Sequence, residues 1–312
     1  MGELEKRKDR IRDEQDVTLV FMAAGMGKRF GGNKQLAALG PKGQSLMAYS
    51  AYDAVEVGYK RLIFILREEM VEEFMATLGE RLKKKIEVSI AIQDPSNLPE
   101  GTTIPKDREK PLGTGHALYC VKDEVKGPFV ILNADDLYGR NVLKDLYSAL
   151  LMGEAMVIPG YPVKNTLSEK GKVSRGILDV DEKGYLRSIK EREKIWAEDG
   201  HFYFEDHDEK VKLSEEALVS MNIWGMQKES LKGLDDVFSA FLGDTKKDLL
   251  KEEFYLPEAM DALRKRNGID LKIIEVKDRW MGMTYAEDAK EIKFRLKEMV
   301  EEGIYPESLF GE

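Results

Sequence analysis

The sequence contains few of the residues that staple small folds or build metal clusters. Among its 312 residues, the single cysteine, Cys120, excludes an internal disulfide framework and any cysteine-based zinc finger. Three histidines are too few to favour an all-histidine metal site. Apolar runs such as 62–66 and 129–132 are far shorter than the ~18 residues that cross a bilayer. With 42% hydrophobic residues, the chain has ample material for a sizeable core instead.

The chain also has no excess of positive charge. It carries 49 lysine and arginine residues against 58 aspartate and glutamate residues, a formal net charge of −9. Nucleic acids and anionic membranes are themselves negative, so we expect neither as a partner. Residues 1–16 are charged throughout and read as a tail or helix without the apolar segment of a signal peptide. These features favour a cytoplasmic, enzyme-sized protein.

Strands alternate with helices in the first half of the chain. Continuous apolar runs with β-branched residues are typical of strands that are covered on both faces. The patterns predict strands at 17–24, 61–66, 86–93 and 127–136, and helices at 45–58, 68–84 and 116–125. Such alternation with short joints predicts an α/β fold, with a parallel sheet and helices on both of its faces.

The second half of the chain is less regular. Its patterns predict helices at 141–153 and 284–303, strands at 155–163, 216–226 and 271–276, and a β-hairpin at 175–191. No internal repeat or low-complexity linker divides the sequence. We therefore expect one α/β domain over 17–303 with an inserted β-rich lobe, followed by a tail at 304–312. Two separate domains are the weaker alternative.

A glycine-rich loop with basic residues follows the first predicted strand. Gly25 and Gly27 have no Cβ, so their backbone can approach an anion closely, and successive N–H groups can surround it. Lys28, Arg29 and Lys34 add positive charge suited to a triphosphate. The loop matches neither the P-loop pattern nor the dinucleotide fingerprint. A tight surface turn with solvated charges is the alternative.

This loop resembles the signature of the sugar-phosphate nucleotidyltransferases, also called nucleotide-sugar pyrophosphorylases. Their Gly-x-Gly-x-Arg and Lys-x-Leu elements correspond to Gly25, Gly27, Arg29, Lys34 and Leu36, with a shortened spacer. The resemblance implies a Rossmann-like, glycosyltransferase-A-like mixed sheet, mostly parallel and flanked by helices. It implies that Arg29 and Lys34 are catalytic, and that the surrounding backbone binds the nucleotide at Ala23, Ala24, Gly25, Met26, Gly27 and Lys28.

Two further segments extend the resemblance on the nucleotide side, within the half at about 17–140. The family's Leu-Gly-Thr-Gly-His-Ala segment corresponds to Leu112, Gly113, Thr114 and the residues after them. Gln93 is placed like the family's base-reading glutamine. The similarity to uridylyltransferases favours UTP, with dTTP as a second option. For the glycines of the first segment the structural alternative is a helix-entry turn, and for Gln93 it is an ordinary polar residue at a strand end. Loop 94–109 is either a lid over the base or passive.

The resemblance also implies a metal site and a sugar site. Asp135 corresponds to the family's Mg²⁺ ligand, with Asp136 beside it, although paired aspartates can also cap a following helix. In the sugar-binding half, at about 141–283, it implies contacts from Asp136, Gly176, Glu191, Arg192 and Asn222. A shifted alignment would choose Glu193 and Lys194 in place of Glu191 and Arg192.

One position departs from the family pattern. Gly282 stands where the family has a late aspartate that binds the metal, and Asp278 is a candidate to replace it. The implied reaction joins an NTP and a sugar 1-phosphate into an NDP-sugar with release of pyrophosphate. A cytidylyltransferase acting on a non-sugar phosphate and a non-catalytic nucleotide-binding protein are the alternatives. Homo-oligomer formation is left open.

Overall fold

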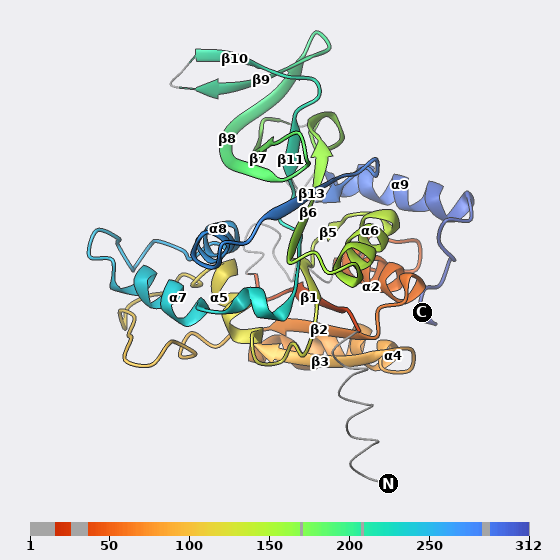
Figure 1. Cartoon of the computed structure of the whole chain (residues 1–312). Coiled ribbons are helices and arrows are strands. Elements are labelled where there is room, and N and C mark those ends of the chain that lie inside the picture. The colour runs from red at the N-terminus through yellow and green to blue at the C-terminus, as the bar shows by residue number, and fades with distance from the viewer. Residues whose placement is uncertain (1–15, 26–36, 169–170, 207–208, 283–287, 312) are drawn as a thin grey trace.

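A computed structural model describes residues 16–25, 37–168, 171–206, 209–282 and 288–311. A central mixed sheet runs through the molecule (Figure 1). Its parallel part has the order β4-β1-β2-β3, formed by Phe129–Asn133, Thr18–Met22, Arg61–Leu66 and Glu87–Ile92. These four strands confirm the predicted α/β fold with a parallel core, because all three of their pairings are parallel.

The helices cover both faces of this sheet. Alternate residues of β1 point to opposite cores: Leu19 and Phe21 join one cluster, and Val20 and Met22 join the other. The first core is completed by helices α2 (Leu46–Val57), α6 (Arg140–Leu151) and α9 (Asp288–Glu301). The second is completed by α5 (Thr114–Val121), α7 (Leu234–Gly243) and α8 (Leu256–Asn267). Figure 1 shows the two groups on either side of the sheet.

The sheet continues through antiparallel strands into a lobe that projects from the body (Figure 1). Beyond β4, the order is β12, β6, β11, β7, β8, β9 and β10, with β13 also paired to β6. These strands span Trp224–Met226, Met156–Pro162, Leu218–Ser220, Val173–Val180, Leu186–Glu198, His201–Asp206, Glu209–Leu213 and Leu271–Glu275. A separate two-stranded sheet pairs β5 (Asp136–Leu137) with β14 (Met281–Gly282).

Several elements differ from the sequence-based expectations. The predicted strand 216–226 is interrupted between β11 and β12, where Asn222 has a positive φ of 57°. The predicted helix 68–84 contains a 3₁₀ turn (Glu68–Met70), α3 (Val71–Phe74), a π-helical segment (Met75–Gly79) and α4 (Glu80–Leu82). The sequence patterns did not reveal α7, α8, β9 or β10.

Residues 304–311 pack against the body of the protein, whereas the sequence analysis separates 304–312 as a tail. Tyr305, Leu309 and Phe310 are buried, and the Tyr305 hydroxyl donates to Asp53 Oδ2 at 2.7 Å. The aromatic residues of this segment are buried against α2, so the segment belongs to the domain. Within the described residues, no helix is both long and apolar enough to cross a membrane.

Candidate active site

The carboxyl ends of the parallel strands bring three predicted site segments to one edge of the sheet. Residues 23–25 follow β1, Gln93 follows β3, and Asp135 follows β4. In open α/β sheets this edge is where ligands bind, because the strands end there and loops surround a crevice. Ala23 and Ala24 are buried and Gly25 is exposed. The predicted residues Met26, Gly27, Lys28, Arg29 and Lys34 lie outside the described residues.

Gln93 lies against the glycine-rich entry to α5. Its Nε2 donates to the Gly113 carbonyl oxygen at 3.0 Å and lies 3.4 Å from Nδ1 of His116. Burial lowers the pKa of His116 to about 4, with partial compensation from the carbonyl oxygen of Asn97. The structure therefore brings together Gln93 and Gly113, which the sequence analysis placed on the nucleotide side.

The segment Leu112–Thr114 also holds the chain that leads into α8. The Phe254 N–H donates to the Leu112 carbonyl oxygen at 2.8 Å, and Thr114 Oγ1 accepts from the Leu256 N–H at 2.9 Å. A Cβ on Gly113 would lie 2.5 Å from the Phe254 carbonyl oxygen, so only glycine fits there. The segment therefore also forms the helix-entry turn that was the structural alternative to nucleotide binding.

A cavity of about 300 Å³ lies between the end of β4 and the projecting lobe. Five of the predicted sugar and metal residues line it: Asp135, Asp136, Gly176, Glu191 and Asn222. They come from segments far apart in the sequence, at the ends of β4 and β11 and on the β7–β8 hairpin. Other lining residues, which the sequence analysis did not name, include Asn133, Arg175, Ser220 and Trp280.

The β7–β8 hairpin sets the register of the sugar-side residues. Gly176 pairs directly with Glu191, and a Cβ on Gly176 would lie 2.9 Å from Ile189 and 3.4 Å from Glu191 Oε2. Burial raises the pKa of Glu191, and the positive charge of Arg175 opposes this shift. This placement favours Glu191 over Glu193, the alternative alignment, because Glu191 lines the cavity.

A chain of hydrogen bonds holds Asp136 at the cavity wall. The Trp224 indole N–H donates to Asn222 Oδ1 at 3.3 Å, and Asn222 Nδ2 donates to Asn133 Oδ1 at 3.0 Å. Asn133 Nδ2 in turn donates to Asp136 Oδ2 at 2.9 Å. Because an indole only donates and an ionised carboxylate only accepts, the two ends fix the orientation of both amides. Asn222 therefore positions the acid through Asn133 as well as lining the cavity.

Gly282 lies directly opposite Asp136 in the β5–β14 pair. A Cβ at this position would lie 2.1 Å from Asp136 Oδ1 and 2.2 Å from the Trp280 ring. No side chain fits there unless Asp136 or Trp280 moves. The close pairing of β5 with β14 therefore leaves no room for a side chain at the position where the sequence departs from the family pattern. Asp278, the candidate to replace the missing acid, is absent from the cavity lining, and its two oxygens accept from Asn141 Nδ2 and the backbone N–H of Val142.

The positive charge in the cavity comes from Arg175, while Arg192 is placed elsewhere. Arg192 lies over the Phe204 ring, pairs with Asp206 at 3.4 Å, and is absent from the cavity lining. Arg175 stacks on Trp280, with 5.0 Å from its guanidinium carbon to the ring centroid. Its Nε is buried without a hydrogen-bond partner among the described residues. An arginine within a predicted hairpin strand is a weak signal, so sequence reasoning missed it.

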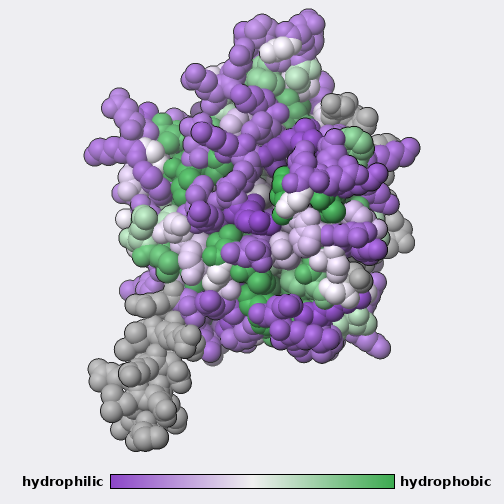
Figure 2. Space-filling view, turned by 90° about the vertical axis from the view of Figure 1, so that its right-hand side faces the viewer, coloured by the Kyte–Doolittle hydropathy of each residue, from purple (hydrophilic) through white to green (hydrophobic). Residues whose placement is uncertain are grey.

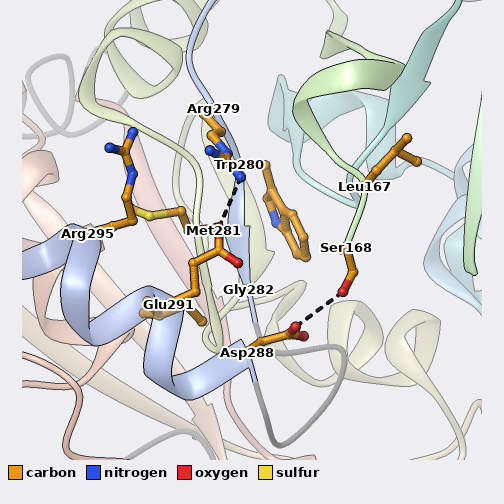
Figure 3. A pocket seen from close by; sticks show the side chains of 10 residues that line it. Leu167, Ser168, Arg279, Trp280, Met281, Gly282, Asp288, Glu291 and Arg295 are labelled. Atoms are coloured by element: carbon orange, nitrogen blue, oxygen red, sulfur yellow. Dashed lines mark hydrogen bonds and ion pairs between the residues drawn. The ribbon is translucent and has the colours of Figure 1, made fainter. Parts of the chain in front are cut away.

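A second, smaller cavity of about 40 Å³ also has Trp280 in its lining (Figure 3). Its lining is charged but internally paired. Arg279 Nη2 donates to Glu291 at 3.1 Å, and Ser168 Oγ donates to Asp288 at 3.2 Å (Figure 3). Trp280 lines both cavities. The size and pairing of this cavity leave the larger one as the candidate site.

Neither a protein-family model nor a curated protein matches the chain. Solved structures do match in fold. HddC from Yersinia pseudotuberculosis is 17% identical, with a TM-score of 0.54, covering 89% of this chain and 99% of that one. A Bacillus anthracis protein assigned as a glucose-1-phosphate thymidylyltransferase, solved with a sucrose, is 13% identical with a TM-score of 0.58, covering 90% and 95%.

A third match is the inositol-1-phosphate CTP transferase from T. maritima. It is 13% identical with a TM-score of 0.56, and the match covers 91% of this chain and 97% of that one. At such identities the likeness concerns the fold, and it spans nearly the full length of each solved chain. The chain therefore has the Rossmann-like fold of these solved nucleotidyltransferases, with a mixed sheet whose parallel core is flanked by helices.

Proposed function

We propose that the chain is a sugar-1-phosphate nucleotidyltransferase, which joins an NTP to a sugar 1-phosphate and releases pyrophosphate. The observation that carries this proposal is the cavity at the end of β4. It gathers five residues that the sequence resemblance assigns to the sugar and the metal: Asp135, Asp136, Gly176, Glu191 and Asn222. The fold shared with solved nucleotidyltransferases supports the same reaction class.

The donor set at this cavity fits Mg²⁺. Asp135 and Asp136 provide carboxylate oxygens at the end of β4, and Mg²⁺ commonly uses one or two carboxylates together with substrate phosphates and water. Among the described residues, no group of three or more histidine, cysteine or acidic side chains is placed to hold a metal ion. Asp135 is therefore the proposed ligand, supported by Asp136. When bound, the ion would neutralise phosphate charge.

The protein's own task is to hold two anions in line. The phosphate of the sugar substrate is already ionised at neutral pH, so its oxygen attacks the α-phosphorus without a general base. Arg29 and Lys34 are proposed to stabilise the charge on the α-phosphoryl group and the leaving pyrophosphate. Arg175 supplies positive charge in the sugar cavity, where Arg192 was expected to do so. Glu191 and Asn222 are placed to bind sugar hydroxyls.

On the nucleotide side we propose UTP as the preferred substrate, with dTTP second. Gln93 and the Leu112–Thr114 segment support this choice through their resemblance to uridylyltransferases. One solved match is a CTP transferase for inositol 1-phosphate, so a cytidylyltransferase acting on a non-sugar phosphate is the second candidate. A cytoplasmic location is consistent with the proposed substrates.

Pyrophosphate release tests the proposal across a panel of NTPs, sugar 1-phosphates and inositol 1-phosphate. We expect release only when an NTP and a sugar 1-phosphate are both present, and only with Mg²⁺. Asp135→Asn should shift the Mg²⁺ titration to higher concentration, whereas Asp145→Asn on the outer face of α6 should not. If inositol 1-phosphate is the only phosphate that supports release with an NTP, the second candidate is favoured. No release with any pair would contradict the proposal that the chain is an enzyme.

A further inference from the structure

The geometry points to His116 as a positioning residue that leaves Gln93 with only its carbonyl oxygen to offer a base. This inference rests on the proposed function, in which Gln93 reads the base. The two side chains meet at the sheet edge where β3 ends and α5 begins, with 3.4 Å between Gln93 Nε2 and His116 Nδ1. His116 is almost fully buried, so its partners are fixed by the fold.

The backbone determines which ring nitrogen of His116 carries the proton. Nε2 lies 3.0 Å from the carbonyl oxygen of Asn97, in the loop that follows β3. A carbonyl oxygen only accepts hydrogen bonds, so Nε2 must be the protonated nitrogen. Cys120 Sγ, 3.4 Å from the same nitrogen, is compatible with this proton because sulfur is a weak acceptor. In the neutral ring, Nδ1 is then a lone pair that can only accept.

That lone pair fixes the orientation of the Gln93 amide. Nε2 of Gln93 faces two acceptors, the Gly113 carbonyl oxygen at 3.0 Å and His116 Nδ1. Rotating the amide would place Oε1, itself an acceptor, against the Gly113 carbonyl oxygen and His116 Nδ1. Neither of these two acceptors would then receive a hydrogen bond from Gln93. The amide N–H groups are therefore used within the protein. The group left for a ligand is Oε1, an acceptor.

An acceptor at this position selects among bases of similar shape. Uracil and thymine carry a hydrogen on ring nitrogen N3, whereas cytosine has a lone pair there. Placed opposite N3, Gln93 Oε1 would accept from the first two and repel the third. The expected preference is about tenfold, the size of one net hydrogen bond. His116 thus contributes to specificity without touching the base.

The tautomer is the first test and needs no activity. Nitrogen-15 NMR of the imidazole rings distinguishes a protonated Nε2 from a protonated Nδ1. The sequence has three histidines, so the His116 signals are identified by their loss in His116→Phe. A neutral ring with the proton on Nε2 is the expected result. A proton on Nδ1 overturns the inference, because Nδ1 would then repel the Gln93 amide nitrogen.

Calorimetric affinities for UTP, CTP and N3-methyl-UTP form the second test. In the wild-type protein, CTP and N3-methyl-UTP should each bind about tenfold more weakly than UTP. In His116→Phe the amide keeps only the Gly113 carbonyl oxygen as an acceptor. Its orientation is then held less firmly, and the gap between UTP and CTP should close to about threefold or less. Cys120→Ala is the matched control, because it touches His116 from the Nε2 side and leaves Nδ1 unchanged.

The outcomes separate this inference from the proposed function. An unchanged gap between UTP and CTP in a folded His116→Phe protein overturns the inference while the enzyme still stands. No binding of any NTP to the wild type contradicts the proposed function itself. If His116→Phe does not fold, the wild-type tautomer, assigned by elimination against His201→Gln and His207→Gln, decides the inference.

Discussion

At the scale of single residues, Gly282 shows why this cavity differs from the pattern that its sequence resembles. Position 282 is a strand residue paired with Asp136, so any side chain there would occupy the space of the Asp136 carboxylate. An acid does not fit at this position as the two strands lie, because it would overlap Asp136 and Trp280. Sequence reasoning could see the substitution but could not see the reason, which depends on β14 meeting β5.

Gly282→Ala should therefore impair both stability and activity. The new methyl group would overlap Asp136 Oδ1 and the Trp280 ring, and such overpacking typically costs about 1–3 kcal/mol in the free energy of unfolding. Pyrophosphate release should fall as Asp136 is displaced. The matched control is Gly243→Ala, where a Cβ would meet nothing within 4 Å and stability should change by less than about 0.5 kcal/mol. Equal effects of the two variants in thermal unfolding would contradict the close approach.

Arg29→Ala should lower turnover by about 10²-fold or more and leave the fold intact, because it removes a group proposed to stabilise the transition state. Initial rates of pyrophosphate release at saturating substrates measure the effect. Arg187→Ala serves as the control, since Arg187 is exposed on β8. A turnover number within twofold of the wild type in Arg29→Ala would remove Arg29 from the catalytic role.

At the scale of elements, the parallel core was the most predictable part. The apolar runs at 61–66 and 129–132 form β2 and β4 because strands covered on both faces need side chains that avoid water. The break at Asn222 was not predictable, because its cause is the network through Asn133 to Asp136, far away in sequence. The strands of the second half pair mostly in antiparallel fashion, and the local sequence pattern does not indicate which strand pairs with which.

The C-terminal segment after α9 is a second element that the sequence pattern did not predict correctly, because a tail outside the domain was expected there. It is short, follows the helix-ending Gly303 and ends in glycine and glutamate, yet Tyr305, Leu309 and Phe310 are buried. Deletion of 304–312 should therefore reduce the free energy of unfolding by at least about 3 kcal/mol, since each such side chain contributes about 1.5–3 kcal/mol on burial. Urea denaturation measures the change.

Deletion of 311–312 alone is the control for this truncation, because it keeps every buried side chain of the segment. We expect its denaturation midpoint to match that of the full chain. If the longer truncation is equally neutral, the segment does not stabilise the domain, and the contact between Tyr305 and Asp53 has no energetic weight.

At the scale of the whole molecule, the buried Asp53 links stability to pH. Burial raises its pKa from 3.8 to about 6, although hydrogen bonds from Tyr305 and Arg140 oppose the shift. Between these two values the folded protein keeps a proton that the unfolded chain releases. The contribution of Asp53 to stability is therefore complete below about pH 3.8 and is lost as the pH rises to about 6.

Asp53→Asn should remove this dependence. Between about pH 4 and pH 6, the wild type should lose up to about 3 kcal/mol relative to the variant, from two pKa units at 1.36 kcal/mol each. Denaturant titrations of both proteins across this range measure the difference. Parallel stability profiles for the two proteins would contradict the raised pKa.

One face of the molecule is mostly hydrophilic. Figure 2 shows one face covered mostly by hydrophilic residues, with hydrophobic residues in small groups between them. The net charge of −9 opposes phosphates only at long range, because salt screens charges beyond about 10 Å. The local positive charge of Arg175 lies inside the cavity and acts directly. The charge balance argues against nucleic acids and anionic membranes as partners, but it could not indicate where an anion would bind.

Phosphorus NMR of the protein with UTP, a sugar 1-phosphate and Mg²⁺ tests the central claim most directly. If the proposed reaction occurs, the UTP and sugar-phosphate signals decline together, while the signals of a sugar-linked diphosphate and of pyrophosphate grow in equal amounts. Omitting either substrate should leave the other unchanged. Persistence of all starting signals with every NTP and phosphate pair, or hydrolysis of UTP to UDP and phosphate without a sugar-linked product, would contradict it.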